Sequence, residues 1–197
     1  MSTALSTPIL REGLKHIIEK LERCAGELNA RDAELGDGDL GVTMLRGARS
    51  LLAELPDLPD DVGLALLKCA QTLTKISGST YGTLLATGLM SAAKAVRGRR
   101  EVPWSEISPL LAGAVQAMSR RGNGQLGDKT VLDALQAASV ATQDIEDPAA
   151  LVAAAEQAVA TSIERFRDQP SRQGRARIFA DRSVGKDDPG MVAFIRI

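Results

Sequence analysis

The sequence predicts an all-α protein of roughly eight antiparallel helices that form a closed bundle or barrel. Apolar residues recur three and four positions apart through most of the 197 residues, which is the spacing of one helix face. No convincing run of alternating apolar and polar residues predicts a β-strand. Because no long linker interrupts the pattern and this length is usual for one domain, we expect a single domain over residues 1–197.

The first predicted helix, at residues 8–30, shows this spacing clearly, with apolar side chains at Leu10, Leu14, Ile17, Leu21, Cys24 and Leu28. Pro8 stands near the first turn, where its missing N–H costs nothing. The later helices follow in order at residues 41–54, 62–76, 82–97, 104–120, 130–143 and 148–168, with a short final one near 190–197.

Composition argues against several classes of partner. Lys and Arg number 24 against 25 Asp and Glu, so neither nucleic acid nor an anionic membrane is expected as an obligatory partner. Aromatic residues make up 3%, which leaves few rings for stacking on bases. No apolar stretch is long enough to span a membrane, and the N-terminus lacks the pattern of a signal peptide. We therefore expect a soluble cytoplasmic protein.

The cysteines and the single histidine are not expected to carry chemistry. Cys24 and Cys69 fall on apolar helical positions, which predicts free, buried thiols in a reducing compartment. His16 lies in the first helix among charged residues and away from the connections, so we expect a structural or solvent-exposed side chain. Without a second histidine, His-based metal sites and catalytic triads are disfavoured.

The connections between the helices are of two kinds. The second, fourth and sixth are proline-bearing turns, ELPDLPDD, RGRREVPW and QDIEDP. The odd-numbered connections are rich in glycine and polar residues, and read RDAELGDGDLG, ISGSTYG, RRGNGQLGDKT and QGRARIFADRSVGKDDPG. In an antiparallel array, odd connections share one end and even connections share the other. The four glycine connections are therefore predicted to converge on one rim.

Three aspartates of the first connection, Asp32, Asp37 and Asp39, form a candidate cation site. An extended backbone would point Asp37 and Asp39 to one side, and Asp32 can reach back from the end of the first helix. Close carboxylates repel one another unless a cation neutralises them, and oxygen ligands suit magnesium, manganese or calcium. An EF-hand fails, because Val42 and Ala48 stand where glycine and glutamate are needed. A solvated turn with an aspartate cap is the alternative.

The segment GNGQLG, residues 122–127, matches G-x-G-x-x-G, but no strand precedes it, so the dinucleotide-binding context is absent. GNGQLGDKT also resembles a P-loop, yet Asp128 is inserted before Lys129 and the strand is again missing. Glycines still let backbone amides approach phosphate, and Thr130 can cap the next helix. Asp128 is expected either to join the metal cluster or to bind Lys129. A flexible glycine loop is the alternative.

The two remaining odd connections also suit an anion. Residues 76–82 offer hydroxyl groups at a helix start, from Ser77, Ser79 and Thr80. Residues 174–190 offer positive charges, from Arg175, Arg177, Arg182 and Lys186. Each segment also has an ordinary alternative: hydroxyl caps at the helix start for residues 76–82, and a salt-bridged surface loop for residues 174–190. Together, the four odd connections supply carboxylates, amides, hydroxyls and Arg on one rim. This combination favours a magnesium–nucleotide, whose phosphates a metal and helix N-termini can hold.

Four segments, ELGDGDLG, SGSTYG, GDKTVLDAL and GRARIFADRSVGKDDPG, resemble the signature segments of the ADP-binding (L) subunit of dihydroxyacetone kinases. They occur in family order and span nearly the whole chain. The resemblance implies an all-helical barrel that holds ADP or ATP at one rim through two magnesium ions. It also implies a phosphotransferase of the dihydroxyacetone (glycerone) kinase type, in glycerol metabolism. Such a subunit is active only with a partner, a ketose-binding (K-type) subunit that carries the ketone-binding histidine and the general base.

The resemblance assigns site residues one by one. The family's metal-binding aspartates match Asp32, Asp37 and Asp39. Its nucleotide contacts match Leu40, Gly41, Val42, Thr43, Ser77, Gly78, Gly122, Val131, Arg175, Asp188, Pro189 and Gly190. Asp128, Lys129 and Thr130 are possible supporting residues, and no catalytic residue beyond the metal ligands is assigned to this chain. Leu40 and Lys186 stand where family members usually have histidine, which leaves open the ketose, with three or four carbons, and the phosphoryl donor.

Two donor schemes fit the resemblance. In one, ATP binds and exchanges; in the other, ADP stays bound as a coenzyme and a phosphotransferase-system protein rephosphorylates it. A chain without its own ketose-binding domain favours the second scheme, and a homodimer stays open. The alternatives are an ADP-sensing regulatory module without turnover and a fatty-acid-kinase-like nucleotide domain. The latter is weaker, because the GDGD segment matches the ketose kinase form.

Overall fold

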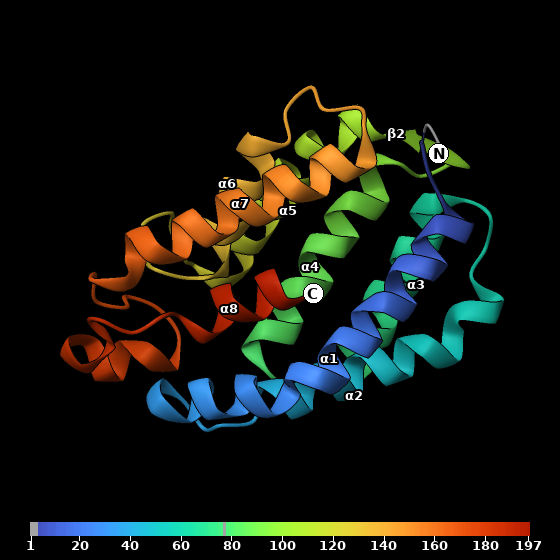
Figure 1. Cartoon of the computed structure of the whole chain (residues 1–197). Coiled ribbons are helices and arrows are strands. Elements are labelled where there is room, and N and C mark those ends of the chain that lie inside the picture. Colours follow the sequence, from blue (N-terminus) through green and yellow to red (C-terminus); the bar gives the residue numbers. More distant parts are fainter. Residues whose placement is uncertain (1–3, 77) are drawn as a thin grey trace.

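The computed structural model describes residues 4–76 and 78–197, and in this part of the chain the elements are helical apart from two short strands (Figure 1). The α-helices are α1 (Thr7–Leu35), α2 (Leu40–Glu54), α3 (Val62–Ile76), α4 (Thr80–Ala95), α5 (Ile107–Gly122), α6 (Val131–Ala141), α7 (Pro148–Arg167) and α8 (Pro189–Arg196). Short 3-10 helices are η1 (Leu55–Asp57), η2 (Trp104–Glu106) and η3 (Arg175–Ser183). The predicted all-α class is confirmed.

Helices that follow one another in sequence lie side by side. Contacts join α1 to α2, α3 to α4, and then α4, α5, α6 and α7 in succession, while α8 packs against α1, α6 and α7. The last helix therefore bridges the first helix and the later ones, as Figure 1 shows at the centre of the molecule. The closed barrel stays a prediction.

The largest core cluster lies where α8 meets its neighbours. Its buried members come from α1, α2, α6, α7 and α8, and include Leu21, Leu28, Ala134, Val159 and Met191. Cys24 belongs to this cluster and Cys69 to another, and both are buried free thiols, as the sequence predicts. No helix among the described residues is long and apolar enough to cross a membrane.

Three features differ from the sequence prediction. The first is that α1 continues to Leu35, five residues past the expected end, so that Asp32 lies in its last turn. The second is η3, which lies in a segment expected to be loop. The third is the antiparallel pairing of β1 (Ala4–Ser6) with β2 (Glu101–Pro103). Strands of three residues are too short to show alternation, and tertiary pairing alone defines them.

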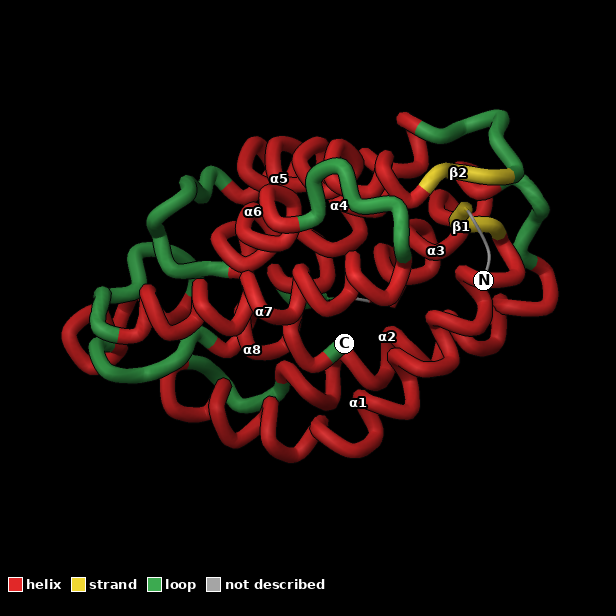
Figure 2. The backbone as a smooth tube through the Cα atoms, turned by 45° about the horizontal axis from the view of Figure 1, so that its top comes forward, coloured by secondary structure: helices red, strands yellow, loops and turns green. Residues whose placement is uncertain are grey.

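The proline-bearing connections lie at the end of the array opposite η3. Thr7 Oγ1 donates a hydrogen bond of 2.8 Å to the Pro59 carbonyl, and Val62 N donates one of 2.7 Å to the Arg99 carbonyl. The second connection is thus fastened both to the start of the chain and to the fourth connection. Figure 2 shows the two strands at this end and the long loops around η3 at the other.

Candidate functional site

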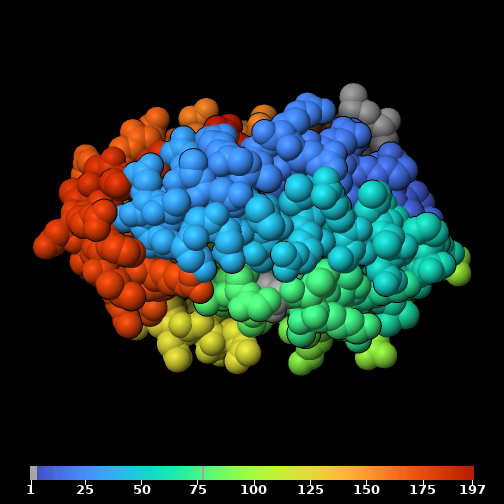
Figure 3. Space-filling view, turned by 90° about the horizontal axis from the view of Figure 1, so that it is seen from below, coloured from blue at the N-terminus to red at the C-terminus, as the bar shows by residue number. Residues whose placement is uncertain are grey.

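All four glycine connections meet around one cavity of about 460 Å³. Their convergence on one rim, which the sequence predicts, is confirmed, because residues from each of the four line the cavity. In the space-filling view of Figure 3, the segment after residue 170 lies beside the end of α1 at one edge of the molecule. The residues that line the cavity include Asp32, Asp39, Gly78, Ser79, Gly122, Gly124, Gly174, Arg175 and Asp188.

The N-termini of α2, α4, α6 and α8 all face this cavity. Odd-numbered helices run toward the site end, so each even-numbered helix begins there, and its first residues contribute to the lining, at Leu40, Thr80, Val131 and Pro189. The first turn of a helix has unpaired N–H groups and the positive end of the helix dipole. Four such ends around one cavity favour a ligand with several negative charges, such as a polyphosphate.

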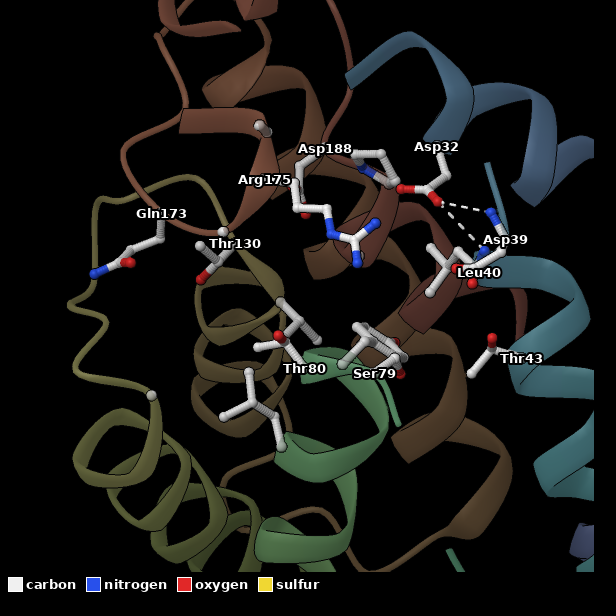
Figure 4. Close-up of a pocket in the computed structure, with 18 of the residues that line it drawn as sticks. Asp32, Asp39, Leu40, Thr43, Ser79, Thr80, Thr130, Gln173, Arg175 and Asp188 are labelled. Atoms are coloured by element: carbon white, nitrogen blue, oxygen red, sulfur yellow. Dashed lines mark hydrogen bonds between the residues drawn. The ribbon is translucent and has the colours of Figure 1, made fainter. Parts of the chain in front are cut away.

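The first connection is held by the carboxylate of Asp32. Its Oδ2 accepts hydrogen bonds from the backbone N–H groups of Gly38, Asp39 and Leu40, at 3.0, 3.1 and 3.3 Å. Two of these bonds are drawn in Figure 4. Asp32 thus caps α2 from the end of α1, which is the role that the alternative of an aspartate cap predicts. All three bonds use one oxygen, Oδ2.

Glycines in this connection permit the close approach of α1 and α2. Gly38 has a φ of +78°, a conformation that side chains rarely adopt. A Cβ at Gly41 would overlap the carbonyl oxygen of Ala25 on α1. The glycines that interrupt the helical pattern in ELGDGDLGV are therefore required by the turn and by the packing of the two helices.

The side chains of Asp32, Asp37 and Asp39 form one acidic cluster. Each offers a carboxylate oxygen, and these three atoms lie within 4.8 Å of one another. Asp39 stands at the N-cap position of α2, yet its side chain makes no capping bond. Oxygen ligands from carboxylates are the donors that Mg²⁺ prefers. The set therefore fits a divalent cation of this kind, with Asp37 and Asp39 exposed toward the cavity.

Arg175, on the seventh connection, neutralises part of this cluster. Its Nη1 forms an ion pair with Asp37 Oδ2, and the Arg175 side chain is 65% exposed. Figure 4 shows its guanidinium extending into the cavity toward Asp32 and Asp39. An exposed ion pair contributes little stability, so the guanidinium can exchange Asp37 for another anion at small cost.

The N-termini of α6 and α8 are capped by their own residues. Thr130 Oγ1 accepts from Leu132 N at 3.2 Å, and Asp133 Oδ2 accepts from Thr130 N at 2.9 Å, which completes a capping box. At α8, Asp188 Oδ1 accepts from Met191 N at 2.8 Å. Burial raises the pKa of Asp188 to about 7, because the environment disfavours the charged carboxylate.

The opposite side of the cavity is apolar. It is formed by side chains of α4, α5 and α6, among them Leu84, Met118 and Leu132, next to Gly122 and Gly124. A Cβ at either glycine would lie 3.2 Å from a leucine methyl group, so these glycines keep the wall flat and close. A cavity with one charged side and one apolar side suits an amphipathic ligand such as a nucleotide.

Most residues that the sequence assigns to the site line this cavity, namely Asp32, Asp37, Asp39, Leu40, Thr43, Gly78, Gly122, Thr130, Val131, Arg175, Asp188, Pro189 and Gly190. Four assigned residues are not part of the lining: Gly41, Val42, Asp128 and Lys129. Ser77 lies outside the described residues. Sequence reasoning missed Arg46, Leu84, Met118 and Gln173, because apolar and long polar residues at helical spacing carry no sign that they border a cavity.

Asp128 and Lys129 have partners other than those the sequence analysis expects for them. Asp128 Oδ2 accepts from Gln125 N at 2.7 Å, which closes a turn, and Asp128 is not a member of the acidic cluster. Lys129 is buried and donates to three backbone carbonyl oxygens. GNGQLG begins at the last residue of the helix α5, so the element before it is a helix and not a strand, as the sequence predicts. His16 is exposed, and its Nδ1 lies 2.9 Å from the Glu12 carbonyl.

The two departures from the family pattern have local partners. Leu40 is buried in the core cluster around α8, and its side chain also borders the cavity. Lys186 Nζ pairs with Glu34 Oε2 at 2.7 Å, across the gap between the seventh connection and α1. Leucine and lysine therefore contribute packing and an ion pair in place of an imidazole.

Comparison with known proteins gives matches over most of the chain. A family model described as the DAK2 domain matches residues 34–197. The ADP-binding subunit DhaL of the PEP-dependent dihydroxyacetone kinase of Escherichia coli is 32% identical over 83% of this chain and 80% of its own length. The L-erythrulose 1-kinase of Mycolicibacterium smegmatis is also 32% identical, over 93% of this chain, which spans about a third (34%) of that kinase.

A solved structure shares the fold. The dihydroxyacetone kinase from C. freundii in complex with AMP-PNP and Mg²⁺ aligns with all of this chain at a TM-score of 0.78 and 22% identity. The alignment covers 34% of that kinase. The helical arrangement described above is thus one that occurs as a part of a larger protein.

Proposed function

The chain belongs to the DAK2 domain family, and we propose that it is the nucleotide-binding subunit of a kinase for dihydroxyacetone or a similar short ketose. Family membership confirms the resemblance found in the sequence. In this proposal, residues 1–197 act as one L-type domain that holds Mg–ADP or Mg–ATP and transfers a phosphoryl group to a ketose on a K-type partner subunit. The similarity to DhaL of E. coli over most of both chains supports this assignment.

The observation that carries the proposal is the meeting of four helix N-termini with three carboxylates around one cavity. Helix N-termini alone favour an anion, whereas clustered carboxylates alone favour a cation. A magnesium–nucleotide satisfies both, because it presents phosphate oxygens and a metal together. The apolar wall of α4 to α6 is the side on which a base fits.

Asp32, Asp37 and Asp39 are the residues that we propose to hold magnesium, as two ions. Bound there, magnesium would neutralise charge on the phosphates and stabilise the developing charge during transfer. The chain's own residues orient the nucleotide: amides at the starts of α2, α4, α6 and α8 bind phosphate oxygens, and Arg175 exchanges Asp37 for a phosphate. We propose no general base on this chain, and assign that role to the partner.

The same comparisons support proposals for the ketose and for the donor. The match to an L-erythrulose kinase supports a four-carbon ketose beside dihydroxyacetone, and the match to a PEP-dependent subunit supports ADP as a retained coenzyme. Extensive dialysis separates the donor schemes. A subunit that keeps ADP acts with a phosphorylated donor protein in the cytoplasm, whereas ready loss of ADP supports exchange of ATP.

The test of the proposal is reconstitution. The purified chain is mixed with a K-type subunit, dihydroxyacetone or erythrulose, magnesium, and either ATP or a phosphorylated donor protein. We expect sugar phosphate to form, and expect Asp37→Ala to abolish it, because the substitution removes a proposed magnesium ligand. Among the described residues, Asp37 forms an exposed ion pair with Arg175, so its loss should leave the fold intact. A full rate with Asp37→Ala refutes the metal assignment. Binding of ADP without any turnover would instead support an ADP-sensing module.

A further inference from the structure

Lys129 is a buried cation that the site does not use directly. Its side chain is 1% exposed, and it is not among the residues that line the cavity. Its Nζ donates hydrogen bonds to the carbonyl oxygens of Arg167, Gln169 and Ser183, at 2.9, 2.8 and 2.8 Å. An ammonium group has three N–H donors, so all of its donors are used. Such an arrangement is specific to an ammonium, because no other side chain donates in three directions from one atom.

The three carbonyls belong to the two ends of one segment. Arg167 is the last residue of α7 and Gln169 follows it, whereas Ser183 is the last residue of η3. Lys129 therefore ties together the two ends of residues 168–183, which we call the arm. The middle of the arm carries Arg175 into the cavity.

Other hydrogen bonds close the base of the arm at the same place. Ser171 N donates to Ser183 Oγ at 2.7 Å, and Arg172 N donates to the carbonyl of Asp128, the residue before Lys129, at 3.0 Å. Ser171 and Ser183 are themselves buried. The base of the arm is thus fixed against the fifth connection by hydrogen bonds, one of them between buried residues.

The tip of the arm carries exposed side chains on either side of one buried residue, Ala176. Arg175 is 65% exposed, and among the described residues it pairs with the exposed carboxylate of Asp37. Ile178, three residues further, is 80% exposed. A fixed base with an exposed tip lets a short arginine-bearing segment change partners without loss of its anchor, since local opening follows low burial and few contacts.

We infer that Lys129 is a positioning residue for Arg175: by fixing both ends of the arm, it sets the guanidinium at the phosphate end of the cavity. This inference rests on the proposed function, in which that cavity holds a magnesium–nucleotide. Lys129 touches neither the nucleotide nor the metal in this scheme. Its effect on binding passes through Arg175.

A double-mutant cycle tests this directly. The affinity for ADP with magnesium is measured by calorimetry for the wild type, Arg175→Ala, Lys129→Met and the double variant. We expect Arg175→Ala to weaken binding about 10-fold in the wild type, the range for one charge-assisted hydrogen bond. In the Lys129→Met background the same change should cost less than about twofold, since coupled residues are not additive. Lys94→Met, at an exposed position on α4, is the matched control and should leave the Arg175→Ala effect intact.

A second measurement does not depend on a variant that folds. In the wild type, hydrogen exchange should be slow at the base amides of Ser171 and Arg172, with or without Mg–ADP. It should also be slow at Gly185 N, which lies just after the arm and donates to the Arg167 carbonyl at 2.9 Å. Amides from residue 175 to 179 should exchange fast in the free protein and slow down only with Mg–ADP. The inference is overturned if the base amides exchange as fast as those of the tip. It is also overturned if Arg175→Ala weakens ADP binding as much in the Lys129→Met background as in the wild type. Failure of the wild type to bind Mg–ADP overturns the proposed function and, with it, this role.

Discussion

The two ends of the helix array differ in how aspartates are used at the N-termini of helices. At the end with the proline-bearing connections, α3 and α7 begin with aspartates whose side chains are used as caps: Asp61 Oδ1 accepts from Leu64 N and Asp147 Oδ1 from Ala150 N, both at 2.8 Å. At the other end, α2 is capped from outside by Asp32, while its own N-cap residue, Asp39, makes no side-chain cap. The two carboxylates at the first end accept hydrogen bonds from backbone N–H groups of their own helices. At the second end, the carboxylates of Asp37 and Asp39 face the cavity.

This difference indicates at which end of the helix array a ligand can bind. Both ends carry helix N-termini, so the dipole alone does not select one of them. The end with prolines is filled by its own contacts: Gly98 N donates a hydrogen bond to Asp61 Oδ2, and Thr7 Oγ1 donates one to the Pro59 carbonyl. Glycine connections leave room and keep carboxylate oxygens available. The predictions below test this division.

The largest effect is expected from alanine substitutions at two N-cap aspartates, Asp39 at the cavity and Asp147 at the end with prolines. Asp39→Ala should weaken the binding of ADP with magnesium by at least about 10-fold, because it removes a proposed metal ligand, and should leave stability nearly unchanged. Asp147→Ala should do the reverse, with a loss of about 0.5–2 kcal/mol of unfolding free energy and normal binding. Calorimetry and urea unfolding measure both quantities. Equal behaviour of the two variants would contradict the division between the ends.

Next in size are two glycines at helix contacts, one at each end. A Cβ at Gly41 would overlap the Ala25 carbonyl, and a Cβ at Gly63 would lie 2.6 Å from Arg97 Cα. Alanine at either position should cost about 1–3 kcal/mol through overpacking. Only Gly41→Ala should also weaken nucleotide binding, because it displaces the start of α2.

The control for these glycines is Gly26→Ala. Gly26 is an exposed position in α1 where a Cβ would meet nothing within 4 Å. Alanine there should stabilise the protein by up to about 1 kcal/mol through helix propensity. A loss of stability at Gly26, or none at Gly41 and Gly63, would show that the helix contacts are looser than described. Thermal and urea unfolding are the measurements.

A smaller effect concerns pH. Burial raises the folded-state pKa of Asp188 to about 7, above its ordinary value of 3.8. Between these two values the folded protein binds this proton more tightly than the unfolded chain, so the contribution of Asp188 to stability falls as pH rises from about 4 to about 7 and is constant above. Asp188→Asn should remove this fall. Urea unfolding of both proteins at pH 5 and pH 8 measures it, and an unchanged pH dependence argues against a raised pKa for Asp188.

The smallest effect is expected at a partly exposed ion pair at the end with prolines. Arg99 and Glu106 form two contacts, at 2.6 and 2.7 Å, on the fourth connection. Exposed pairs contribute little because water screens them, so Arg99→Ala should leave the urea midpoint and the affinity for ADP nearly unchanged. A marked change in ADP affinity would mean that the two ends are coupled.

The helices could be predicted from the sequence more completely than the site. Apolar spacing located α2 and α3 to within one residue at either end, since periodicity is a local property of one helix face. The end of α1 was missed by five residues because RDAEL has too few apolar positions to extend the pattern, whereas the structure continues the helix to Leu35. The strands β1 and β2 were missed because three-residue strands exist only through their pairing.

For the site, the sequence by itself determined the acidic cluster, the glycine connections and their meeting on one rim, because alternating connections of antiparallel helices share an end. Only the tertiary structure decided what each residue does there. It gave Asp32 three backbone N–H groups to cap, buried Lys129 under the arm, and placed Leu84 and Met118 on the apolar wall. The physical reason is that spacing in sequence specifies a helix face, whereas burial and hydrogen-bond partners depend on segments far apart in the chain.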